Sequence, residues 1–284
     1  MRLTRIAVLS AAIAVFGGAA WAAQEQAQQP EPQQEPAAES RPPSHAPEDE
    51  TLPPALPLVA SPAELGAYQE ALNQPDPDQK ITLAEKFLQD YPESNLRSHV
   101  YSALATAYQQ KNDYDKVVEN GEKSIALDPD NVMSLVMVAQ VLPQRLGGSG
   151  LEMAQKLSRA ERYATHGLEL VDSLSQPANV LPEEFEKKKA TLSSMLHSAL
   201  GLVYLQRGAV GKAREEFEIA VSLGNPPDPT DYFRLGEAYR GERKYDEAIE
   251  AFEKAAELAP GTLINQLANE QVQKLKTVRD IMQK

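Results

Sequence analysis

From Ser61 to the carboxyl end of the chain, apolar residues recur at helical spacing, and short clusters of Pro, Gly, Asn and Asp interrupt them. No segment of this region alternates apolar and polar residues as a half-buried strand does. The run Ser61-Pro62-Ala63-Glu64 has the residues of a capping box, in which the serine caps a helix and the glutamate reaches back to the cap. The pattern predicts an all-α fold that begins at Ser61.

Residues 1–22 have the pattern of a secretory signal peptide. Arg2 and Arg5 precede an apolar run of about 15 residues, and Ala20-Trp21-Ala22 places small residues where a signal peptidase cleaves. The run is shorter than the roughly 20 residues that a membrane-spanning helix requires. We therefore expect cleavage before Ala23 and export to the periplasm or the exterior. The alternative is an uncleaved membrane anchor, and no later stretch is apolar enough to span a membrane.

Residues 23–60 differ from the rest in composition. Ten of the 21 prolines lie between Pro30 and Pro62, among glutamines and acidic residues. Such a segment buries too little apolar surface to offset its chain entropy, so we expect a disordered tether. Its one apolar patch, Leu52 to Val59, is a candidate for docking on the folded part.

Three copies of one motif occur downstream of the tether. The last copy has large residues at Tyr232, Leu235, Tyr239 and Phe252 and small ones at Gly236, Ala248 and Ala255, and it ends at Pro260. A second copy has His197, Leu200, Gly201, Tyr204, Ala213, Phe217 and Ala220. A third has Tyr101, Leu104, Ala105, Tyr108 and Pro129.

This order and spacing resembles the tetratricopeptide repeat (TPR), a pair of antiparallel helices that stacks on its neighbours. The resemblance implies a right-handed superhelix of about five helix pairs with a C-terminal capping helix. We divide the domain, 61–284, into repeats 61–97, 98–131, 132–193 (enlarged), 194–228 and 229–262, followed by the cap, 262–284. The ending of the first repeat, Phe87 to Ser94, is similar to TPR units of bacterial envelope-assembly proteins.

The enlarged repeat is expected to hold a helix near Asn131 to Leu146, a turn at Gly147 to Gly150 and a long helix from Leu151 to about Leu174. A further long helix should run from Pro182 toward Gln206. In the last helix, apolar residues from Ile264 to Met282 form one stripe, with polar residues on the opposite face. This helix is predicted to cap the superhelix, and a homodimer through it is the alternative.

Composition narrows the function. The chain has 28 Lys and Arg against 41 Asp and Glu, a net charge of −13, and no cysteine. The acidic balance argues against nucleic acid as a partner, and the lack of cysteine excludes disulfides and thiolate metal sites. The four histidines, at positions 45, 99, 166 and 197, show no paired-ligand spacing, so we expect neither a metal nor a cofactor.

The TPR resemblance implies a non-catalytic scaffold that holds partner proteins, here in envelope assembly or secretion. The alternative is an enzyme or ligand-binding protein with a site assembled from scattered acidic residues and histidines. In the TPR pattern, positions 2, 5, 9 and 12 of each first helix face the concave side. They predict a groove for an apolar or amphipathic segment, lined by Met133, Val136, Gln140, Met195, Leu202, Leu205, Phe233, Glu237 and Arg240. The competing interpretation is that these side chains cover one another or lie under Leu52 to Val59.

Overall fold

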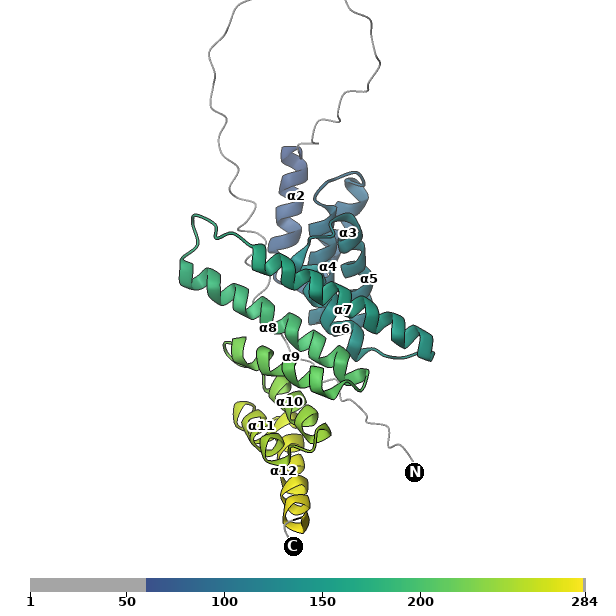
Figure 1. The fold of residues 1–284 in the computed structure, drawn as a ribbon. Coiled ribbons are helices and arrows are strands. Elements are labelled where there is room, and N and C mark those ends of the chain that lie inside the picture. Colours follow the sequence, from purple (N-terminus) through teal and green to yellow (C-terminus); the bar gives the residue numbers. More distant parts are fainter. Residues whose placement is uncertain (1–59, 283–284) are drawn as a thin grey trace, which may run out of the picture.

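The computed structural model describes residues 60–282, so the predicted signal peptide and nearly all of the predicted tether lie outside the described residues. The described part consists of helices joined by short loops, with no strand between residues 60 and 282 (Figure 1). The helices are α2 (Pro62–Asn73), α3 (Pro77–Asp90), α4 (Arg97–Gln110), α5 (Tyr114–Leu127), α6 (Val132–Val141), the short 3-10 helix η1 (Leu142–Gln144), α7 (Gly150–Ser173), α8 (Pro182–Gln206), α9 (Val210–Leu223), α10 (Pro229–Gly241), α11 (Tyr245–Leu258) and α12 (Leu263–Met282).

Successive helices pack against each other as five pairs, α2 with α3 through α10 with α11, followed by α12. The first helix of a pair also contacts the first helix of the next, as α4 contacts α6 and α8 contacts α10. The pairs therefore stack from α2 at one end to α12 at the other (Figure 1). The fold is a helical repeat solenoid, as predicted.

The helix starts follow the capping residues. The Glu64 amide donates to Ser61 Oγ at 3.2 Å and the Ser61 amide donates to Glu64 Oε2 at 3.3 Å, which confirms the predicted capping box. Ser149 and Glu152 form a second capping box at the start of α7. Proline occupies the first turn of α2, α3, α8 and α10, where its missing N–H costs no hydrogen bond.

Small and large residues interlock inside the last two pairs. A Cβ on Gly201 would lie 2.7 Å from Phe217 Cε1, and a Cβ on Gly236 would lie 2.8 Å from Phe252 Cε1. Both phenylalanine rings are fully buried. The two glycines thus let the first helix of each pair approach the aromatic ring of the second.

The enlarged repeat departs from the prediction in one respect. We expected a helix to Leu146, but α6 ends at Val141 and continues only as η1. Pro143 explains the early end, because proline has no amide to donate and its ring clashes with the preceding turn of a helix. The following helices are long, 24 residues in α7 and 25 in α8 against 14 in α4, α5, α9 and α11.

The apolar stripe of α12 packs in part against α11. Ala268, Val272 and Leu275 are buried in a cluster with α11 residues, whereas Val278 and Ile281 are 39% and 68% exposed. The exposed side carries polar residues such as Gln266, Asn269 and Gln273. Among the described helices, none combines the length and the hydropathy that crossing a bilayer requires.

Candidate protein-interaction surface

Seven of the nine predicted groove residues are partly exposed on the first helices of their pairs. Met133 on α6 and Met195 on α8 rest on one core cluster, and Leu205, near the end of α8, rests on the next. Phe233 on α10 packs edge-on against Phe252, with ring centroids 5.1 Å apart. The helices α6, α8 and α10 therefore each carry partly exposed apolar side chains that pack against the buried core.

The other two predicted groove residues are not available to a partner in this structure. Val136 is fully buried between α6, α7 and α8, and Leu202 is 1% exposed among Phe217, Leu235 and other residues of the last two pairs. The cause is close stacking, because α6 contacts α8 and α8 contacts α10 directly. At these two positions the side chains are covered by neighbouring helices of the solenoid, as in the competing interpretation.

The end of this surface nearest α12 is polar. Arg240 pairs with Glu237 one turn earlier and donates to Gln271 Oε1 of α12 at 3.1 Å. Burial raises the pKa of Glu237, and its Oε1 atom has no hydrogen-bond partner among the described residues. Gln140, on α6, accepts at its backbone oxygen a bond from Gln144 Nε2. Apart from Gln140 on α6, the partly exposed surface is therefore apolar over α6, α8 and the start of α10, and it is charged where α10 meets α12.

Sequence reasoning missed a buried layer of hydroxyl groups between α4, α5 and α6. Ser134 Oγ donates to Ser124 Oγ at 2.8 Å, and Ser98 Oγ lies 3.1 Å from the same Ser124 atom. Asn131 Nδ2 donates to Ser98 Oγ at 3.2 Å. All four residues are buried, and single small polar residues in a helical pattern give no sequence signal for such a layer.

The corresponding place between α8 and α10 holds a charged residue. Asp231 is 3% exposed and accepts a hydrogen bond from Ser198 Oγ of α8. Arg234, one turn along α10, places Nη1 at 3.3 Å from Ser198 Oγ and 3.5 Å from Asp231 Oδ1. Burial raises the pKa of the Asp231 carboxyl to about 6, against the opposing charge of Arg234.

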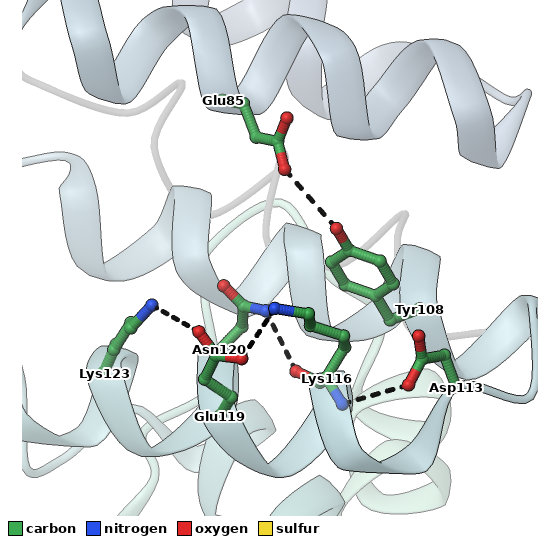
Figure 2. A network of polar contacts seen from close by, with 7 residues as sticks. All are labelled: Glu85, Tyr108, Asp113, Lys116, Glu119, Asn120 and Lys123. Carbon is green, nitrogen blue, oxygen red and sulfur yellow. Dashed lines mark hydrogen bonds and ion pairs between the residues drawn. The ribbon is translucent and has the colours of Figure 1, made fainter.

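Tyrosines near the ends of the first helices tie each pair to the preceding helix. Tyr108 Oη lies 3.4 Å from Glu85 of α3 (Figure 2), and Tyr204 Oη lies 3.1 Å from Glu161 of α7. Tyr239 Oη donates to Glu218 of α9 at 2.7 Å. The same type of contact thus recurs along the solenoid and fixes the register between neighbouring helices.

Figure 2 also shows an ion-pair run on α5. Glu119 accepts from Lys116 and Lys123, each at 2.8 Å, and these hydrogen bonds lower its pKa to about 2. The Asn120 amide turns back to the Lys116 carbonyl. The three charged side chains are exposed, so this run is a solvated helix surface.

The described histidines lie on separate helices. His166 of α7 contacts Asp130, and His197 of α8 contacts Glu216 of α9 at 2.7 Å. His99 lies on α4. Within the described residues, no three His, Asp or Glu side chains come together in a way that could hold a metal ion.

Comparison with known proteins gives the same repeat. Residues 98–131 and 229–262 each match a family model of the tetratricopeptide repeat. No curated protein has a matching sequence. Among solved structures, a thermophilic TPR protein of Thermus thermophilus is similar with a TM-score of 0.51 and 19% identity over 74% of this chain and 98% of that chain. PilF of Pseudomonas aeruginosa is similar with a TM-score of 0.52 and 20% identity over 77% and 86% of the two chains. At these identities the likeness extends to the fold alone.

Proposed function

We propose that this chain, in which residues 98–131 and 229–262 match the tetratricopeptide repeat, is a non-catalytic scaffold that binds apolar or amphipathic segments of partner proteins. The binding surface is the inner side of α6, α8 and α10, where Met133, Met195, Leu205 and Phe233 are partly exposed. An amphipathic helix laid across these three helices would place its apolar face on them.

One observation carries the proposal. These four side chains lie on the successive first helices α6, α8 and α10, and each is packed against a buried core cluster. A side chain held from below loses little rotamer freedom when a partner covers its outer side, so contact there adds affinity at low entropic cost. Methionine also adapts to differently shaped apolar partners, which suits a surface that accepts more than one segment.

The test compares three versions of the chain lacking residues 1–22. The parent, the inner-surface variant Met195→Gln/Leu205→Gln and the control variant Ile219→Gln are immobilised and exposed to extracts of the native host. Ile219 is 40% exposed on α9, so its substitution removes an apolar contact elsewhere. We expect the inner-surface variant to lose bound proteins while the control retains them, with both variants unfolding near the parental temperature. Equal capture by parent and inner-surface variant would refute the assigned surface.

We further propose that the scaffold works outside the cytoplasm, in envelope assembly or secretion. The support is the pattern of Arg2, Arg5, the following apolar run and Ala20-Trp21-Ala22. Amino-terminal sequencing of the native protein should then begin at Ala23. Recovery of the intact amino terminus in a membrane fraction would instead support the anchored alternative.

A further inference from the structure

Two junctions of the solenoid carry different chemistry at the same repeat position. Ser134 and Asp231 are each the third residue of their repeats, which begin at Val132 and Pro229. The serine belongs to the neutral layer between α4 and α6, in which its hydroxyl group has a partner. The aspartate lies at the equivalent repeat position between α8 and α10 and is also buried. The layer between α4 and α6 therefore contains no group that titrates, whereas the junction between α8 and α10 contains an ionisable carboxyl group.

The comparison is close because the neighbouring contacts repeat. Ser98 and Ser194 each begin a repeat, and their hydroxyl groups donate to the backbone oxygens of Ser124 and Ala220 at 3.2 Å and 2.8 Å. The two junctions thus share a framework of buried serines. The layer of Ser98, Ser124, Ser134 and Asn131 contains no charged residue, whereas the junction between α8 and α10 holds two, Asp231 and Arg234.

The charge of Asp231 is only partly balanced. From its own helix and cap it experiences Arg234, whose Nη1 is 3.5 Å away, and the like charge of Asp228. From α8, Asp231 is contacted by the neutral hydroxyl group of Ser198. The nearby titratable residues His197 of α8 and Glu216 of α9 contact each other. The adjacent Thr230 Oγ1 is buried without a hydrogen-bond partner among the described residues. An ionised Asp231 is therefore a costly group at this junction.

The junction holds a terminal part of the chain. We call α10, α11 and α12 the C-terminal unit; α10 packs on α8 and α9, and α11 and α12 pack on α10 and on each other. The apolar contact across the junction includes Leu202 on one side and Leu235 on the other. In a repeat protein each unit is held by its nearest neighbours, so weakening one interface releases an end unit without unfolding the rest.

We propose that the junction between α8 and α10 is a proton-sensitive seam, at which ionisation of Asp231 promotes local opening of the C-terminal unit and protonation closes it. Opening would uncover Leu202 and Leu235, which are buried in the closed form. The seam is independent of which partner the scaffold binds, because it rests on contacts within the chain.

Hydrogen exchange measured by mass spectrometry on the full chain, without a partner, tests the seam. Asp231 has a closed-state pKa of about 6 against an ordinary value of 3.8, so the closed form holds the proton more tightly. Stability of the seam therefore falls as pH rises from about 4 to 6 and is level above that. After correction for intrinsic exchange rates, opening of α10 and α11 should increase about tenfold between pH 5.0 and pH 7.5. Peptides from α4 and α5 serve as the internal reference and should show no such increase.

Two variants assign the effect. Asp231→Asn keeps an acceptor for Ser198 and removes the charge, so the tenfold increase should disappear. Glu250→Gln removes one charge from an exposed position of α11 in the same unit and should leave the increase intact. The proposal is overturned if α10 and α11 show no pH dependence in the parent, a result that requires no variant to fold. It is also overturned if the dependence persists in Asp231→Asn.

Discussion

Substituting Gly201 by alanine tests whether close approach between helices determines the packing of the solenoid. The new Cβ would meet Phe217 Cε1 at 2.7 Å and Cδ1 at 2.8 Å. Unstrained carbon atoms stay about 3.5–4.0 Å apart. The ring is fully buried, so it has no free space into which it can withdraw without moving its neighbours.

Two opposing effects set the magnitude. Alanine is preferred to glycine inside a helix by about 1 kcal/mol. Overpacking a well-filled core costs about 1–3 kcal/mol. Because the overlap approaches 1 Å against an enclosed ring, we place the packing cost in the upper half of that range, at about 2–3 kcal/mol, and expect the free energy of unfolding to fall by about 1–2 kcal/mol.

A matched glycine gives the opposite expectation. Gly66 lies inside α2, and a Cβ there would meet no atom within 4 Å. Gly66→Ala should therefore raise the free energy of unfolding by about 0.5–1 kcal/mol. Urea denaturation followed by circular dichroism measures both variants, and Phe217→Leu combined with Gly201→Ala should recover part of the loss because the ring edge is gone.

The sign of the Gly201→Ala effect is decisive. If Gly201→Ala stabilises the protein as Gly66→Ala does, the absence of a side chain at position 201 is not what allows the two helices of this pair to pack closely. If Phe217→Leu fails to reduce the cost of Gly201→Ala, the clash lies elsewhere and the assignment of the ring as the obstacle is wrong.

Two further substitutions test the polar contacts between helices. Tyr239→Phe should lower the free energy of unfolding by about 1 kcal/mol because it removes the 2.7 Å hydrogen bond to Glu218. The hydroxyl group of Tyr232 has no partner among the described residues, so Tyr232→Phe should change the free energy of unfolding little. Equal effects of the two substitutions would contradict the assignment. Ser134→Ala should cost about 1 kcal/mol, since it removes the 2.8 Å hydrogen bond to Ser124 Oγ, which keeps Ser98 as its remaining hydroxyl partner. Its control, Ser158→Ala at an exposed site on α7, should be neutral in the same denaturation assay.

The helices and their pairing follow from the sequence because local rules decide them. Ser61, the prolines at helix starts and the glycine–phenylalanine pairs act within one or two turns or within one repeat. A local rule also explains the prediction that was wrong. We extended the helix that begins near Asn131 to Leu146, although Pro143 cannot be accommodated inside an α-helix, and α6 ends at Val141.

The surface could be predicted only in part. Repeat position shows which side of a helix faces inward, but how tightly neighbouring repeats stack depends on all their side chains together. Val136 and Leu202 were therefore assigned to a groove although the next first helix covers them. Asp231 was missed for a related reason, since an acidic residue in the first turn of a helix looks like a favourable partner of the helix dipole. Only its burial beneath α8 distinguishes it from an exposed acidic residue.

The length of α7 and α8 has a consequence for how the chain reaches its native state. These helices share two separate apolar clusters with α6, and one of these clusters contains both Val136 of α6 and Leu196 of α8. Such contacts join residues that lie far apart in the sequence, so loop entropy opposes them more than it opposes the contacts within one outer pair. We therefore expect the transition state for folding to be centred on the outer pairs, with the contacts between α6 and α8 forming afterwards, so that core substitutions such as Phe87→Ala near the amino-terminal end slow refolding more than Leu196→Ala in the middle.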